Sequence, residues 1–236
     1  MNGENSMADQ SYFFHHLGNP YIQSNSTSFL NTLNSVRVFH KHLPTNVNRQ
    51  IYLPPIIIRF LHATQSLKGV DVYLNGKKIL YNFSFKEISQ YITLPVGIYL
   101  IEIYPQGSTS TPIIRKEVKL KENHHYTLPL ISKDKTFQLL EYIDDNKIQS
   151  PITNIRVINL SSFYKNIDVS IKNGNTLFST IGFKEATPYL TLTPMTVDLE
   201  IKNSLTKETI REITNTTFKP NLNHSIVLLN HSVIIY

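Results

Sequence analysis

Two arginines and two aspartates recur at the same spacing in the two halves of the sequence. Arg59 precedes Asp71 by twelve residues, and Arg156 precedes Asp168 by the same interval. A guanidinium group can bind a carboxylate or a phosphate through two parallel hydrogen bonds, so each pair is a candidate anion site. Opposite charges on neighbouring strands also form ordinary cross-strand pairs. We expect this structural role, because surface pairs are common and individually weak.

Other groups that support catalysis or metal binding are poorly placed. The chain has nine histidines and no cysteine, so a metal site would rest on histidine spacing. Neighbouring histidines such as His15-His16 and His124-His125 point to opposite faces of a strand, and no spacing matches a metal-ligand motif. The sequence also lacks a G-x-S-x-G motif and a phosphate-binding glycine loop. We therefore expect no enzyme, no metal and no cofactor.

The composition favours strands over helices. Hydrophobic residues make up 41% of the chain and charged residues only 17%, so Asn, Ser and Thr supply most of the polarity. The formal charge of +6 is spread without a dense Lys/Arg block, which argues against nucleic acid as a partner. No apolar run approaches the roughly 18 residues of a membrane span, and residues 1–10 lack the features of a signal peptide. We expect a protein made in the cytoplasm and deposited on a spore or cell surface layer.

An internal repeat sets the organisation. Ile58-Arg59 and Val70-Asp71-Val72 return as Ile155-Arg156 and Ile167-Asp168-Val169, at an offset of 97. Later matches follow in order at offsets of 98 and 99: Asn75-Gly76 with Asn173-Gly174, Tyr91 with Tyr189, and His125 with His224. Ordered matches with rare single insertions indicate a duplication.

Each repeat reads as a series of short strands. Apolar and polar residues alternate in residues 70–74, and an Asn-Gly turn joins them to residues 77–80. Such a turn has positive φ angles, so we expect Gly76 and Gly174 to adopt them. Six or seven strands in about 90 residues are typical of a small sandwich. The sequence predicts two tandem immunoglobulin-like antiparallel β-sandwich domains.

The predicted domain boundaries follow from this pattern. Residues 1–54 form an N-terminal extension, partly flexible, residues 55–147 the first sandwich and residues 148–236 the second, with a polar linker ending in Pro151. The extension contains a short alternating run with Val36, Val38 and Phe39. An extended peptide can add a strand to an open sheet edge, so we predict a docking strand here, for the same or a neighbouring molecule.

The sequence resembles bacterial domains of the family called domain of unknown function 4397. The resemblance rests on residues 58–63, 70–76 and 91–99 in the first repeat and extends in weaker form over residues 55–236. In the second repeat His62 is replaced by Asn159, and Pro95-Val96-Gly97 by Pro194-Met195-Thr196. The resemblance implies an immunoglobulin-like sandwich, often in tandem and on bacterial surface proteins, and it implies no chemistry.

Three functions remain open at this point. The first is a structural or assembly protein of a bacterial surface or spore envelope layer that acts through protein contacts, including self-association. The second is a carbohydrate- or ligand-binding module, in which exposed aromatic rings stack on sugars. The candidates for stacking are Tyr73, Tyr91, Tyr99 and Tyr104. An enzyme is the third, and we favour the first.

Overall fold

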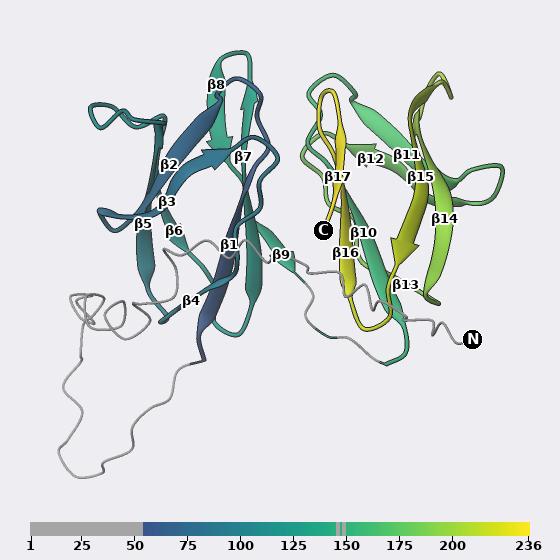
Figure 1. The fold of residues 1–236 in the computed structure, drawn as a ribbon, viewed down its shortest axis with the longest axis horizontal. Coiled ribbons are helices and arrows are strands. Elements are labelled where there is room, and N and C mark those ends of the chain that lie inside the picture. Colours follow the sequence, from purple (N-terminus) through teal and green to yellow (C-terminus); the bar gives the residue numbers. More distant parts are fainter. Residues whose placement is uncertain (1–53, 145–146, 148–149) are drawn as a thin grey trace, which may run out of the picture. The chain divides into compact units, whose positions relative to one another are not determined.

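The computed structural model describes residues 54–144, 147 and 150–236. These residues form strands, turns and bends, and no helix occurs among them. The predicted all-β class is therefore confirmed (Figure 1). Residues 1–53 lie outside the described part, and so do Val36, Val38 and Phe39 of the predicted docking strand.

The first repeat is a sandwich of two sheets. One sheet has the strand order β4-β1-β7-β8, with β9 also paired to β7, and the other has the order β3-β2-β5-β6. The strands are β1 (Ile56–His62), β2 (Gly69–Leu74), β3 (Lys77–Ser84), β4 (Ile92–Leu94), β5 (Ile98–Pro105), β6 (Ile114–Lys119), β7 (His125–Lys133), β8 (Thr136–Leu139) and β9 (Tyr142–Asp144).

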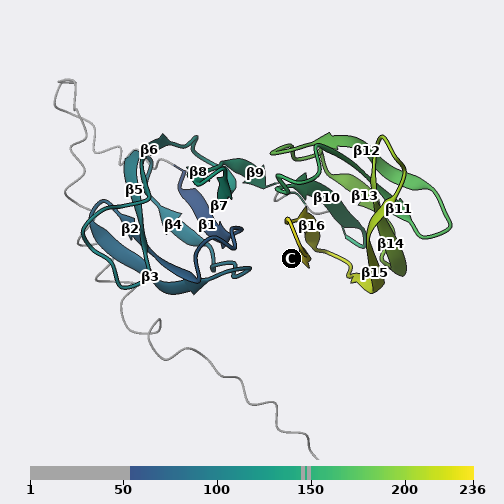
Figure 2. The same ribbon diagram turned by 90° about the horizontal axis from the view of Figure 1, so that it is seen from above.

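The second repeat follows the same plan, with sheets β13-β10-β16-β17 and β12-β11-β14-β15. Figures 1 and 2 show that the two sheets of each repeat face one another, so the predicted tandem sandwich is confirmed. The strands are β10 (Thr153–Asn159), β11 (Asn166–Ile171), β12 (Thr176–Gly182), β13 (Leu190–Leu192), β14 (Met195–Asn203), β15 (Thr209–Phe218), β16 (Asn223–Leu228) and β17 (Val233–Ile235).

One strand pair in each repeat departs from the antiparallel pattern. β1 pairs in parallel with β7, and β10 pairs in parallel with β16, whereas the other pairs between named strands are antiparallel. A parallel pair needs a long crossover connection. The strands of the opposite sheet supply this connection, because they lie between the two partners along the chain.

The core of each sandwich lies between its two sheets. Along β2 the side chains of Val70, Val72 and Leu74 are buried, whereas Tyr73 lies on the other face and is half-buried. In the second repeat Ile167 and Val169 of β11 join a buried apolar cluster with residues of β10, β12, β14, β15 and β16. Alternation along a strand therefore separates a core face from an outer face, as the sequence pattern predicts.

A further apolar cluster contains residues from both repeats. Its buried members are Leu61, Ala63, Ile131, Ile158, Leu160, Val227 and Leu229. The described residues of both repeats accordingly fall within one compact unit. The second sandwich has a core of its own, but strands near the boundary also bury apolar side chains together with residues of the other repeat. The boundary expected between residues 147 and 148 lies beside residues outside the described part.

The predicted turn at Asn75-Gly76 is confirmed by its backbone angles. Asn75 has a φ of 49° and Gly76 a φ of 77°, as a type I′ turn requires at its two central positions. A β-branched residue is strained at such an angle. Gly76→Val should therefore lower the free energy of unfolding by about 1 kcal/mol or more in a urea titration. Unchanged stability would mean that the turn tolerates another geometry.

The corresponding turn of the second repeat differs. The N–H of Ile171 donates to the carbonyl of Asn175 at 3.0 Å, which leaves a loop of Lys172, Asn173 and Gly174. Asn173 has a φ of 57°, whereas Gly174 is not among the glycines with positive φ. The prediction for Gly174 is wrong. The inserted residue lies inside the turn and makes a three-residue loop, in which Asn173 has the left-handed angle and Gly174 does not.

Candidate functional site

The four candidate charged residues do not form the predicted pairs. Arg59 lies on β1 and Asp71 on β2, and these strands belong to different sheets of the first sandwich. Arg156 on β10 and Asp168 on β11 are separated in the same way. The predicted cross-strand pairs are therefore wrong. The chain crosses from one sheet to the other within the twelve residues from each arginine to its aspartate.

Each aspartate instead stabilises an irregular position on the neighbouring edge strand. Asp71 Oδ1 accepts the N–H of Asn82 on β3 at 2.9 Å, and Asp168 Oδ1 accepts the N–H of Thr180 on β12 at 2.8 Å. Asn82 and Thr180 have φ angles of 49° and 55°, and the strand register shifts nearby in both pairs of strands. A bulge leaves a backbone N–H without its ladder partner, and the carboxylate satisfies it.

A lysine completes each aspartate site. Lys78 Nζ lies 2.9 Å from Asp71 Oδ2, and Lys207 Nζ lies 2.8 Å from Asp168 Oδ2. Burial raises the pKa of Asp71, but the hydrogen bonds from Asn82 and Lys78 outweigh it and hold that pKa below its usual range. The pKa of Asp168 is lowered by the same balance. Both carboxylates thus stay ionised near neutral pH and do not act as proton donors.

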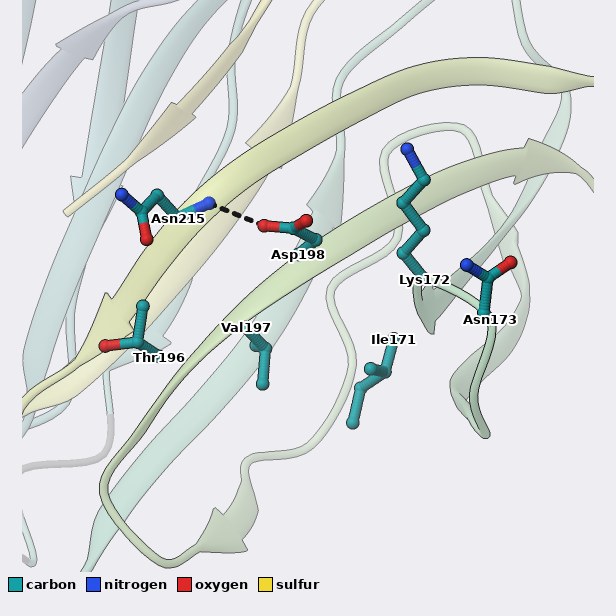
Figure 3. A pocket seen from close by; sticks show the side chains of 7 residues that line it. All are labelled: Ile171, Lys172, Asn173, Thr196, Val197, Asp198 and Asn215. Carbon is teal, nitrogen blue, oxygen red and sulfur yellow. Dashed lines mark hydrogen bonds between the residues drawn. The ribbon is translucent and has the colours of Figure 1, made fainter.

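A third aspartate uses the same device beside a shallow hollow. Figure 3 shows Asp198 on β14 accepting the N–H of Asn215 on β15, at 2.8 Å, and Asn215 has a φ of 58°. The hollow has a volume of about 430 Å³. Its other charged side chain, Lys172, donates to Glu212 at 2.6 Å. Both charged groups of the hollow are thus engaged by the protein itself.

Asp144 joins the two arginines. This residue ends β9 and is 5% exposed, and its Oδ1 accepts a hydrogen bond from Arg156 Nη2. Its Oδ2 lies 3.4 Å from Arg59 Nη2 and accepts the hydroxyl protons of Thr127 at 2.7 Å and Tyr91 at 2.6 Å. One buried carboxylate therefore forms ion pairs with an arginine from each repeat.

The same two kinds of contact hold each arginine. Its Nε donates to a hydroxyl on the parallel neighbouring strand, and its guanidinium lies over a tyrosine ring. The contacts are Arg59–Thr127 at 2.9 Å, Arg59–Tyr91 at 4.4 Å, Arg156–Ser225 at 2.9 Å and Arg156–Tyr189 at 4.9 Å. Burial lowers the pKa of Arg156, but Asp144 more than offsets this and the pKa is raised. The arginines are therefore structural.

The four tyrosines proposed for stacking fall into two groups. Tyr99 is buried in the core and donates to the carbonyl of Pro95 at 2.5 Å, and burial raises its pKa to about 12. Tyr91 belongs to the Asp144 network, and burial also raises its pKa. Tyr73 and Tyr104 remain half-buried on β2 and β5. Tyr73 and Tyr104 lie outside both the core and the Asp144 network, whereas Tyr91, although 40% exposed, is held by Asp144 through its hydroxyl group.

The tyrosine face, as we call it, lies on the sheet β3-β2-β5-β6 and consists of Tyr73, Tyr81, Tyr104, Lys78 and Asp71. The rings of Tyr73 and Tyr104 meet edge to face, with centroids 5.1 Å apart. Lys78 Nζ lies 5.3 Å from the ring centroid of Tyr73 and 5.1 Å from that of Tyr81. Tyr81 is 70% exposed. Two rings thus flank one lysine that is paired with Asp71, and a third ring packs against the first of them.

The second repeat carries no such face. In the strand register Ser170 stands for Tyr73, Lys202 for Tyr104 and Thr176 for Lys78. A hollow of about 380 Å³ lies over these residues. Its charged side chains form the pairs Lys207–Asp168 and Lys202–Glu200. The tyrosine face is therefore a feature of the first sandwich and not of the shared scaffold.

The described residues offer little else of chemical interest. No cluster of three or more His, Asp or Glu side chains that could hold a metal ion occurs among residues 54–144, 147 and 150–236. Within the same residues no helix is long and apolar enough to cross a membrane. The tyrosine face is the candidate binding surface of this part of the chain.

The fold and this face define a tandem β-sandwich protein with a candidate contact surface. Residues 57–170 match the family described as "Domain of unknown function (DUF4397)". The resemblance noted in the sequence is confirmed over these residues, from β1 to β11, a shorter stretch than the expected residues 55–236. A comparison with curated proteins finds no match.

Two solved structures are similar at low identity. A carbohydrate-binding module of family CBM26 from Eubacterium rectale, in complex with maltoheptaose, is 10% identical, with 77% of this chain and 96% of that chain covered and a TM-score of 0.25. The Bacillus anthracis TIE protein is 12% identical, with 75% and 34% covered and a TM-score of 0.25. A TM-score of 0.25 is too low to indicate a shared ligand or function.

Proposed function

We propose that the protein is a non-catalytic binding module of a bacterial surface layer, a cell wall or spore envelope, and that it binds through the tyrosine face of the first sandwich. The observation that carries the proposal is the difference between the repeats. Tyr73 and Tyr104 stand where the second repeat has Ser170 and Lys202. Because the second sandwich forms without tyrosines at these positions, folding alone does not require them.

The charged groups support a binding role over catalysis. Asp71, Asp144 and Asp168 each accept hydrogen bonds from the protein's own groups, and Arg156 is held in the Asp144 network. Exposed aromatic clusters, in contrast, are enriched where proteins contact their partners. A ring as exposed as that of Tyr81, at 70%, contributes to contact only when a partner covers it.

Binding to isolated surface layers tests this proposal. The purified chain should sediment with Gram-positive cell walls or spore coats, and a variant that carries Tyr73→Ser and Tyr104→Lys should lose at least about tenfold in affinity, since two stacking contacts are removed. Both substitutions copy the residues of the second repeat, so the fold should survive them.

Thr176→Ala, at the equivalent surface of the second repeat, is the matched control and should bind as the unchanged chain does. Circular dichroism confirms that each variant is folded. A chain that sediments with neither layer, or a double variant that binds as well as the control, would show the proposal to be wrong.

A further inference from the structure

We infer that the ligand of the tyrosine face is a neutral carbohydrate. This inference rests on the proposed function, since it names the chemistry of the partner at the same surface. It follows from three properties of the face: the arrangement of its rings, the polar pair among them and the local balance of charge.

The rings form a platform. Tyr73 and Tyr104 lie at 66° to each other with centroids 5.1 Å apart, and Lys78 contacts the rings of both Tyr73 and Tyr81. One face of a pyranose ring presents C–H groups, which pack on the electron-rich face of an aromatic ring. Rings at several orientations can hold successive sugars of a chain, whereas a flat apolar ligand would need them parallel.

The polar pair supplies a fixed hydrogen-bond donor. Lys78 Nζ donates to Asp71 Oδ2 at 2.9 Å, which raises the pKa of Lys78 and keeps both groups charged. Lys78, whose side chain is 24% exposed, has further protons for a ligand, whereas the Asp71 side chain is 4% exposed and serves to hold the ammonium group in place. A sugar hydroxyl group can accept such a hydrogen bond.

The charge balance disfavours ions. Lys78 and Asp71 neutralise one another, and the neighbouring pair Arg115 and Glu102, with 3.7 Å between Nη1 and Oε1, does the same on β6 and β5. An anionic ligand would be repelled by Glu102 and a cationic one by Lys78 and Arg115, so neither gains from the face as a whole. A neutral polyhydroxyl chain incurs no such repulsion.

Treated cell walls test the inference. Walls digested with protease should still bind the chain, whereas walls oxidised with periodate, which cleaves sugar diols, should lose at least about tenfold in affinity, as two stacked rings contribute. Tyr81→Ser, at an exposed side chain, should weaken binding without changing the unfolding midpoint. Affinity electrophoresis with soluble xylan, laminarin and glycol chitin then identifies the sugar, with polygalacturonate as the anionic control.

The outcomes separate the two proposals. Binding that depends on the tyrosines but is lost with protease and unaffected by periodate would identify a protein partner, which overturns the carbohydrate while the binding module stands. Stronger retardation by polygalacturonate than by every neutral glycan would overturn the neutral ligand. Wall binding that ignores the tyrosine substitutions altogether would refute both.

Discussion

Replacing Asp144 by alanine should lower the free energy of unfolding by about 3–5 kcal/mol. The substitution leaves Arg156, whose side chain is 2% exposed, without the carboxylate that neutralises it. The hydroxyl groups of Thr127 and Tyr91 lose their acceptor at the same time. An uncompensated buried charge is among the most costly results of a single substitution. Urea unfolding followed by circular dichroism measures the effect.

Two further variants identify the cause. Asp144→Ala combined with Arg156→Met should be more stable than Asp144→Ala alone, because the unpaired charge is removed with its partner. Arg115→Ala, at an exposed arginine 3.7 Å from Glu102, should change stability little. If the double variant is as unstable as Asp144→Ala, the charge of Arg156 is not the reason for the loss.

The sequence did not predict this network, although it predicted both arginines as candidates. Residues 144–151 are mostly polar and end in proline. A solvated linker can have the same composition as a segment that contains a buried aspartate, so composition does not reveal the role of Asp144. Its contacts with other strands do. Asp144 lies opposite His125 in the register of β9 and β7, and Thr127 and Tyr91 lie far from it in the sequence. Such contacts leave no local pattern.

The strands were predictable where alternation extends over five or more residues. The short edge strands β4, β13 and β17, with three residues each, were missed. Three residues show no clear period, and their conformation is set by the neighbouring strand with which they pair. The tandem sandwich could thus be predicted, while these three-residue edge strands could not.

Aligning identical residues of the two repeats also gave one wrong equivalence. His125 and His224 were aligned, but Ile58 pairs with Tyr126 whereas Ile155 pairs with His224. The structure therefore makes Tyr126 the equivalent of His224. Their chemistry agrees, because Tyr126 Oη accepts the N–H of Lys121 at 3.0 Å and His224 Nε2 accepts that of Lys219 at 3.2 Å. Different side chains perform one task here.

The tyrosine face was only partly predictable. Alternation places Tyr73 opposite the core face of β2, which the sequence shows. Its meeting with Tyr104 depends on the register of β2 and β5, in which Asp71 faces Tyr104 and Tyr73 faces Glu102. No pattern within either strand sets that register. Tyr81 was not singled out, because an exposed aromatic residue has no distinctive sequence signal.

His62 is an unusual side chain of the first core. It is 0% exposed, and both of its ring nitrogens lack hydrogen-bond partners among the described residues. The rings of Phe83 and Phe85 have centroids 6.2 and 6.3 Å from its own. The second repeat has Asn159 here, which donates to the carbonyls of Tyr164 and Ile181. A neutral imidazole is tolerated at this position, whereas an imidazolium is not.

Acidification should therefore destabilise the protein through His62. Burial lowers its pKa from 6.5 to about 4, so between these pH values the unfolded chain binds a proton that the folded protein does not. Stability contributed by the neutral form is complete above pH 6.5 and falls by about 3 kcal/mol as the pH falls to 4. His62→Leu removes this titration, retains every carboxylate and should stay stable at pH 7, because no hydrogen bond is lost. Urea unfolding of both proteins at pH 7 and pH 4.5 measures the difference, and equal losses would exclude His62 as the acid-sensitive group.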